Sequence, residues 1–397
     1  MSGESSRLAL PVPRSDPTQV PEKYTQLRSE QPVCPVSLIT GDPAYLVTRY
    51  EDLRAVLADR RLSRGAVCAE DAPQPKATRP NPDSIINMDP PRHARIRKLA
   101  AQAFTPARLE KLRPRMEEIV ADVLDEMAEL TPPVDLVAAF ARPLPLRIVC
   151  ELLGIPFEDQ AKFVHWTDVI MTISSTTEEI TQAYVEMRPY FVEIVERKRK
   201  DPGDDFLSIL TQQSDEEGVL THSELVSLGT FLLVAGHETT STVIANSALF
   251  LFRNPDQLAA LRADPGLLPG AVEEMLRLSI PGVSPFPRIA VSDVTIGGVV
   301  IPQGSAVVVQ YETALRDPGV YDHPDTFDIR RRQVSQVFFG HGPHFCLGAP
   351  VARAEMEIGM WRLFERFPTL ALAVSPQDLK WKDYASLGGF EALPVTW

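Results

Sequence analysis

The strongest constraint on the fold is a largely apolar stretch that runs from residue 224 to 253 without a proline and ends at Asn254-Pro255. At about 1.5 Å per residue, a helix over this stretch is roughly 45 Å long, which is enough to cross a whole domain. A helix that is apolar around its full circumference is buried on all sides. We therefore expect one long central helix with the rest of the chain packed around it.

The other segments are of two kinds. The α-rich segments have helical periodicity, and the β-rich segments hold short apolar runs bounded by Pro, Gly and Asp. The α-rich segments are 50–280 and 347–366, and the β-rich segments are 32–50, 290–312 and 368–397. The stretch 66–84 is expected to be an irregular loop. Without an internal repeat or a low-complexity linker, residues 1–397 are predicted to form one domain that is mostly α with a minor β part.

Composition and charge exclude several classes of partner. The chain has 397 residues, 44% of them apolar, and a net charge of −13. This acidity argues against nucleic acid or an anionic membrane surface as the main partner. The N-terminal residues have neither the apolar core of a signal peptide nor a membrane-spanning run. The expected location is the cytoplasm.

Four cysteines are present, at positions 34, 68, 150 and 346. They form no CxxC pair, and a reducing compartment disfavours disulfides, so three of them are interpreted as small buried hydrophobic residues. Cys346 differs because it lies in a glycine-rich loop directly before a helical segment. Amide donors and the helix dipole at such a position stabilise a thiolate.

Two interpretations of Cys346 come from its neighbours alone. His341, His344 and Cys346 could bind zinc, although no second Cys or His pair stands nearby to complete a tetrahedron. Cys346 could also be a catalytic nucleophile with a histidine base.

A third interpretation comes from the loop as a whole, which resembles the haem-binding signature of the cytochrome P450 family. The resemblance implies a single domain shaped as a triangular prism, with haem b between the long central helix and the cysteine loop. Cys346 would be the axial thiolate ligand of the iron, which promotes cleavage of the O–O bond. The matched cofactor-binding positions are Phe339, Gly340, His344, Cys346, Leu347 and Gly348.

The middle of the long helix resembles the distal-helix motif of the same family. Ala235 and Gly236 would let the haem plane approach the helix. The resemblance implies that Thr239 stabilises the iron-bound peroxide through a hydrogen bond and that Glu238 relays protons as a general acid. The alternative for Thr239 is a hydroxyl that bonds back to a helix carbonyl and merely bends the helix.

Two further groups of charged residues match family positions. Glu274 and Arg277, three residues apart on one helix face, would form a structural buried ion pair. The arginine that often completes this group is replaced by Thr326, and Arg330 or Arg331 could substitute for it. The haem propionates require cationic partners. Those expected partners are His93, Arg97, Arg288 and His344.

Substrate contacts are expected from family analogy, although each residue alone could be ordinary core. The candidates are Trp166, Met171, Leu233, Val283 and Phe286. The resemblance also implies that a ferredoxin and its reductase supply electrons and that the protein is a monomer. The basic residues proposed to dock the ferredoxin, or to be an ordinary solvated face, are Arg92, Arg95, Lys98 and Arg353.

Three functions remain open at this level. The first is a monooxygenase that activates O2 to hydroxylate or epoxidise a small hydrophobic secondary metabolite. The second is an oxidase that couples two aromatic units by radical chemistry without inserting oxygen. The third is a haem-binding sensor, which has no need for the pair Glu238 and Thr239.

Overall fold

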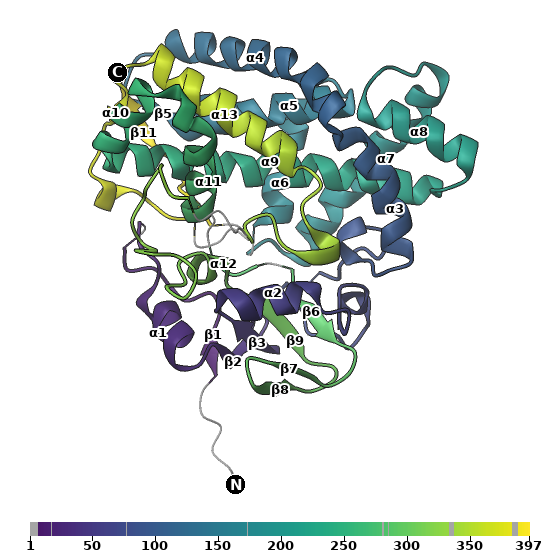
Figure 1. Ribbon diagram of the computed structural model, residues 1–397. Coiled ribbons are helices and arrows are strands. Elements are labelled where there is room, and N and C mark those ends of the chain that lie inside the picture. Colours follow the sequence, from purple (N-terminus) through teal and green to yellow (C-terminus); the bar gives the residue numbers. More distant parts are fainter. Residues whose placement is uncertain are drawn as a thin grey trace.

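The computed structural model in Figure 1 places most of the helices on one side of the molecule and the main sheet on the other. It describes residues 7–16, 18–76, 78–172, 174–279, 282–284, 286–332, 337–382 and 388–397. The long helix α9 runs through the helical part, and the N-terminal segment lies with the sheet (Figure 1).

Helix α9 is the predicted central helix, and it spans His222–Arg253, two residues earlier than the apolar stretch begins. Thr221 caps its start: the Thr221 hydroxyl accepts the N–H of Glu224, and the Glu224 carboxylate accepts the N–H of Thr221. The helix ends at Asn254 because Pro255 cannot continue it. The prediction of one uninterrupted buried helix is confirmed.

Two apolar clusters divide the length of α9. The C-terminal half packs against α4 (Pro106–Ala128), α5 (Pro143–Leu153), α11 (Leu268–Ser279) and α13 (Ala349–Arg366). The N-terminal half packs against α6 (Gln160–Met171), α7 (Thr177–Lys200) and α8 (Phe206–Glu217). The other helices are α1 (Glu22–Glu30), α2 (Tyr50–Ala58), α3 (Arg92–Ala101), α10 (Pro255–Ala263) and α12 (Tyr311–Ala314).

The main sheet has six strands in the order β1-β2-β3-β9-β6-β4. The expected hairpin is present, with β2 and β3 antiparallel, whereas β9 joins β3 in parallel and brings the later β-rich segment beside the first. Its strands are β1 (Leu8–Ala9), β2 (Val33–Ser37), β3 (Pro43–Val47), β4 (Leu62–Ser63), β6 (Arg288–Ala290) and β9 (Ala306–Val309).

Two smaller sheets complete the β part. The strands β7 (Val294–Ile296) and β8 (Val299–Ile301) form a hairpin. The strands β10 (Ala371–Leu372), β11 (Pro394–Thr396) and β5 (Val134–Asp135) form the third sheet. The pattern of the sequence did not predict β1, β4 or β5, because a strand of two residues is too short to carry an alternating pattern. It did not predict the helix α1 either.

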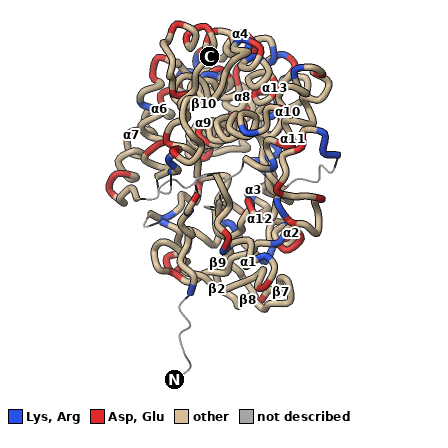
Figure 2. The backbone as a smooth tube through the Cα atoms, turned by 90° about the vertical axis from the view of Figure 1, so that its left-hand side faces the viewer, with Lys and Arg blue, Asp and Glu red and all other residues tan. Residues whose placement is uncertain are grey.

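Charged residues are interspersed over the elements rather than gathered on one face (Figure 2). Many basic side chains are paired with acids, so the positive charge of the chain is largely neutralised locally. Within the described ranges, no helix is both long enough and apolar enough to cross a membrane.

A buried ion network ties α11 to the segment that precedes the cysteine loop. Arg277 donates to both carboxylate oxygens of Glu274, at 2.8 and 2.9 Å, and both side chains are almost fully buried. The third member is Arg331, whose Nε lies 3.1 Å from the same carboxylate, whereas Arg330 is exposed. Arg277 also donates to the carbonyls of Leu315 and Pro324. The network therefore uses backbone carbonyls of the 315–326 segment, and Thr326 needs no charge of its own.

We expect Glu274→Ala to lower the free energy of unfolding by about 3–5 kcal/mol, because it leaves two buried arginines without their counter-ion. Unfolding by urea, followed by circular dichroism, measures the change. The matched control is Glu365→Ala, which removes a half-exposed acid at the same spacing from Arg362 and should cost less than about 1 kcal/mol. Equal losses in the two variants would contradict a buried network.

Candidate functional site

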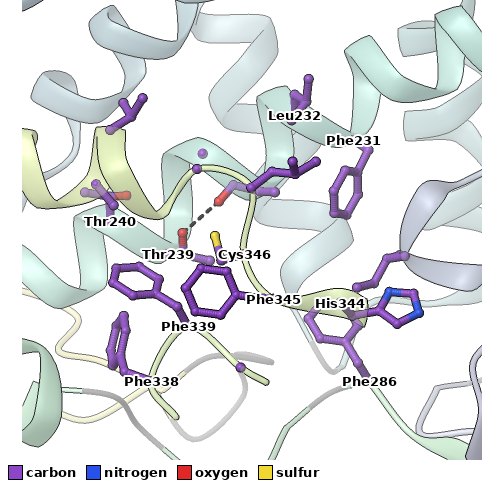
Figure 3. Close-up of a pocket in the computed structure, with 18 of the residues that line it drawn as sticks. Phe231, Leu232, Thr239, Thr240, Phe286, Phe338, Phe339, His344, Phe345 and Cys346 are labelled. Atoms are coloured by element: carbon purple, nitrogen blue, oxygen red, sulfur yellow. Dashed lines mark hydrogen bonds between the residues drawn. The ribbon is translucent and has the colours of Figure 1, made fainter. Parts of the chain in front are cut away.

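A cavity of about 350 Å³ separates the cysteine loop from α9. Most of its lining is apolar, and its walls come from α3, α5, α9, α13, the 282–288 turn and the loop 338–348. In Figure 3 the sulfur of Cys346 points into this space from one side, and Thr239 lies on the helix at the other. The cavity therefore brings together the two motifs that the sequence placed about a hundred residues apart.

Glycines give the cysteine loop its shape. Gly340 and Gly342 have positive backbone φ angles, 82° and 70°, which residues that carry a Cβ rarely adopt. A Cβ on Gly342 would also meet the carbonyl oxygen of Leu57 at 2.9 Å, so only glycine allows the loop to lie against α2. The N–H of Cys346 donates to the carbonyl of Phe339 at 2.8 Å, which closes the loop.

The Cys346 sulfur lies just before the N-terminus of α13. The backbone N–H groups of Gly348 and Ala349 are directed at it, as expected at a helix start. Burial raises the pKa of the thiol, and the Gly348 N–H, Arg97 and the Ala349 N–H oppose this rise. Binding of a metal ion to the sulfur therefore releases the thiol proton.

The face of α9 that lines the cavity follows helical spacing. Phe231, Leu232, Ala235, Gly236 and Thr239 all contribute to the wall. Ala235 and Gly236 leave this part of the helix without bulky side chains, which agrees with the predicted approach of a flat cofactor. The side chain of Leu233 lies about 100° further round the helix and is buried among α6 and α7.

The hydroxyl of Thr239 bonds back to a carbonyl of its own helix, which was the alternative to a role in binding the iron-bound peroxide. It donates to the carbonyl of Ala235 at 2.7 Å, a bond drawn in Figure 3. Thr239 is nevertheless open to the cavity, so the lone pairs of its oxygen can accept a hydrogen bond from a bound water or ligand.

Glu238, the predicted proton relay, does not line the cavity. Its carboxylate lies 3.8 Å from the amine of Lys382, and its other oxygen has no hydrogen-bond partner among the described residues. Burial raises the pKa of Glu238, while Lys382 and Arg142 oppose the shift. Around the helix axis, position 238 lies about 60° from Ala235 and about 100° from Thr239, so its side chain leaves α9 at the edge of the cavity wall.

All four expected propionate partners line the cavity. His93 and Arg97 come from α3, Arg288 starts β6, and the ring of His344 lies against that of His93 with centroids 4.1 Å apart. Burial lowers the pKa of His93 to about 4 and that of His344 to about 2, with nearby basic groups adding to the shift. Both rings can still donate an N–H.

Arg64 is a basic wall residue that the sequence analysis missed. Its guanidinium donates to the carbonyls of Ile86 and Pro287 and, at 2.9 Å, to the side chain of Asn87. Burial lowers its pKa to about 9, and Arg288 contributes to the shift. No motif marks this position, because Arg64 precedes an irregular loop and meets its partners only in the folded chain.

The structure corrects three of the five substrate candidates. Leu233 lies in the helical core, Trp166 is buried and donates its indole N–H to Glu186, and Met171 ends α6 away from the lining. Val283 and Phe286 do line the cavity, and Phe286 is 44% exposed at its edge. The wall also includes Ile85, Ile86, Phe231, Leu232 and Ser284.

Most of the expected basic docking patch is neutralised. Arg92 and Arg95 both donate to Glu224, the residue that caps α9, and Arg353 pairs with Glu273. The same Glu224 carboxylate thereby holds α3, and with it His93 and Arg97, against the start of α9. These arginines fix the cavity wall as well as contributing surface charge.

Haem fits the groups that the cavity presents. A single thiol, that of Cys346, lines the cavity together with an apolar wall that two small residues keep flat, as a planar iron complex requires. Arg64, Arg97 and Arg288 have no carboxylate within ion-pair distance among the described residues. The three arginines carry three positive charges, and the nearby carboxylate of Asp89 offsets one of them. The two positive charges that remain match the two propionates of haem. The described part of the chain contains no cluster of three His, Cys, Asp or Glu side chains suited to a metal ion.

Comparisons with known proteins agree with this site. The model of the cytochrome P450 family matches residues 151–265 and 266–383. The chain is 44% identical over 94% of its length to a cytochrome P450 monooxygenase, PikC, of Streptomyces venezuelae, covering 90% of that protein. It is 41% identical to a mycinamicin IV hydroxylase/epoxidase of Micromonospora griseorubida, covering 94% of this chain and 95% of the relative.

A solved structure agrees as well. The structure of cytochrome P450mel 107F1, described as having biaryl coupling reactivity, superposes with a TM-score of 0.91 at 38% identity, covering 97% of this chain and 98% of that one. The fold class predicted from the sequence is confirmed.

Neighbouring leucines on α9 provide a test of the cavity wall. Leu232→Ala should change the affinity of the haem-loaded protein for 4-phenylimidazole, because the phenyl group of this iron-binding probe lies against the α9 wall. Leu233→Ala should leave that affinity unchanged and instead lower the free energy of unfolding by about 2–5 kcal/mol. Absorption titration and urea unfolding measure the two effects. If Leu233→Ala alone altered the affinity, the helical phase described above would be wrong.

Proposed function

This chain belongs to the cytochrome P450 family and is a monooxygenase, and we propose that it hydroxylates or epoxidises a small hydrophobic secondary metabolite. The observation that carries the proposal is the sulfur of Cys346, directed into an apolar cavity that Ala235, Gly236 and Thr239 of α9 also line.

The family binds haem through a thiolate, and we propose haem b as the cofactor and Cys346 as its ligand. When bound, the haem supplies the activation of O2, with electron donation from the thiolate. The N–H groups of Gly348 and Ala349 support this role because they stabilise negative charge on the sulfur. Phe339, Leu347 and the loop glycines exclude water from the same side.

Arg97 and Arg288 are proposed to bind the haem carboxylates, with ring N–H groups from His93 and His344. Arg64 adds positive charge at the same end of the cavity. Because its own donors are used by backbone carbonyls and Asn87, its contribution is the electrostatic field and the position of the 286–288 turn.

Thr239 is proposed to hold a water in the cavity. The Thr239 hydroxyl donates its hydrogen to the carbonyl of Ala235, so its oxygen can accept a hydrogen bond from the water and orient that water toward the cavity centre. Glu238 is proposed to take part in proton supply only after leaving Lys382, since its carboxyl lies outside the lining.

The substrate is proposed to be uncharged and apolar. The wall away from the cysteine loop is formed by aliphatic and aromatic side chains and one hydroxyl: Ile85, Ile86, Phe231, Leu232, Val283, Ser284 and Phe286. Burial of a substrate against such a wall contributes about 25 cal/mol per Å² of apolar surface. The edge position of Phe286 makes it the residue that an entering substrate meets first.

A ferredoxin served by its reductase is proposed as the electron donor, and the enzyme is proposed to act as a monomer in the cytoplasm. Arg92, Arg95 and Arg353 are already paired with acids, which favours a small docking area for the ferredoxin.

Oxidative coupling of aromatic units is the second candidate. It is favoured by one observation, the likeness to a structure described as having biaryl coupling reactivity. The cavity itself does not distinguish the two reactions, because both use an apolar wall and the same sulfur.

Labelling with heavy oxygen separates the two functions. With a substrate identified by its shift of the haem absorption, turnover under ¹⁸O2 should give a product that contains one labelled oxygen atom. Mass spectrometry of the product measures the label. A dimeric or cyclised product without the label would establish coupling and overturn the monooxygenase proposal.

We expect Thr239→Ala to lower coupled product formation by about a hundredfold, the lower end of the range for a positioned proton-transfer group. The consumed electrons should appear as hydrogen peroxide, measured against the electrons supplied. The matched control is Thr230→Ala, because Thr230 makes the same back-bond on the same helix, 2.9 Å to Val226, but does not line the cavity. Peroxide formation that rises equally in both variants would show that only helix geometry matters.

A further inference from the structure

A buried ion pair joins the N-terminal segment of the chain to the outside of the cavity wall. Nη2 of Arg14 donates to Oε2 of Glu312 at 2.6 Å, and the two side chains are only 7% and 6% exposed. Neither residue lines the cavity. A buried ion pair contributes little net stability, because desolvation of the charges offsets their attraction. What distinguishes this pair is the set of groups that it holds together.

The N-terminal segment holds Arg14 in a fixed place. The N–H of Leu10 donates to a carbonyl of β2 at 2.9 Å, and the N–H of Val12 donates to the hydroxyl of Tyr24 at 2.9 Å. The guanidinium of Arg14 also donates to the carbonyl of Gln19, so the segment folds around its own arginine. The main sheet and α1 therefore fix the position from which Arg14 reaches Glu312.

Glu312 extends this anchoring to the wall of the cavity. The carboxylate oxygen that accepts a hydrogen bond from Arg14 also accepts one from the N–H of Gly282, at 3.3 Å. The next two residues, Val283 and Ser284, line the cavity. The N–H of Ser284 donates to a carbonyl of β9 at 2.8 Å. These three residues are thus held at one end by the sheet and at the other by the ion pair.

The flat face of the Arg14 guanidinium contacts a second segment. Its Cζ lies 4.2 Å from the centroid of the Trp381 ring, which is a favourable cation–π contact. Trp381 forms an antiparallel bridge with Phe390. Beside this bridge, Gly389 packs so closely on Thr242 that an added Cβ would lie 3.2 Å from the Thr242 methyl group. Thr242 lines the cavity, so Arg14 contacts the supports of two parts of the wall.

We propose that Arg14 is a positioning residue for substrate specificity. Through Glu312 it fixes the turn that begins at Gly282. Through Trp381 it fixes the bridge that packs on Thr242. An arginine suits this role because its planar guanidinium donates in its plane and stacks through its face, which a lysine cannot do. The inference rests on the proposed function, since it takes the cavity as the site that binds the substrate.

Two iron-binding probes that differ in length test the positioning role in the haem-loaded protein. The chain of 1-octylimidazole extends from the iron to the outer wall, whereas 1-methylimidazole does not reach that wall. In Arg14→Gln the affinity for 1-octylimidazole, divided by that for 1-methylimidazole, should fall by about tenfold, which is within the range for substitutions that act without touching the ligand. Absorption titration measures both affinities. An unchanged ratio would overturn the proposal.

The matched control is Arg28→Gln. Arg28, on α1, also ties the N-terminal part of the chain to α12, through a 2.8 Å hydrogen bond to the carbonyl of Thr313. It should keep the ratio of affinities even where unfolding by urea shows a loss of stability. An equal fall of the ratio in both variants would show that general loosening of the N-terminal part is the cause, and would overturn the role of Arg14.

A double variant tests the connection through Glu312. Glu312→Ala removes the acceptor that Arg14 and Gly282 share, so it should lower the ratio as well. The double variant Arg14→Gln, Glu312→Ala has no unpaired buried charge, and its ratio should fall no further than that of Glu312→Ala alone. Additive effects would overturn the connection. Failure of the monooxygenase function would instead appear in the unaltered protein, as a product without oxygen from O2, and would leave these affinities unchanged.

Discussion

The rest of the structure depends on one constraint: a single sulfur atom must face a flat apolar helix wall across a closed space. Cys346 meets this constraint because Gly340 and Gly342 bend its loop and the start of α13 directs N–H groups at the sulfur. The opposite wall is flat because α9 presents Ala235 and Gly236 at the same level. Helix α9 has 32 residues and carries this wall in its middle, with a capping box at its start and Pro255 after its end.

Buried charge is arranged in two different ways around that constraint. Glu274, Arg277 and Arg331 form a network whose charges are met by one another and by backbone carbonyls, and such a network stabilises the fold. At the cavity, Arg64 and Arg288 are buried without a carboxylate partner. Incomplete pairing of this kind is unfavourable in an isolated protein, and it is expected where a charged cofactor completes the site.

Much of the site could be predicted from the sequence because short motifs carry it. The cysteine loop, the central helix and the pair Glu274 and Arg277 are local patterns, and each was found where expected. The predictions that failed concerned the direction in which a side chain points, not the place of its residue in the sequence. Leu233 and Glu238 are one residue from wall positions, and one residue in a helix turns a side chain by about 100°. Arg64 could not be found in this way, because only the folded chain shows which buried charges lack a partner.

The most direct measurement of the central claim is X-ray absorption at the iron edge of the purified, haem-loaded protein. The account predicts one sulfur atom in the first coordination shell of the iron, together with the four haem nitrogens. The sulfur should disappear in Cys346→Ser and persist in Cys150→Ser, since Cys150 is buried away from the cavity lining. A first shell of nitrogen and oxygen alone in the unaltered protein would contradict the assignment of Cys346 and, with it, the thiolate chemistry proposed for the cavity.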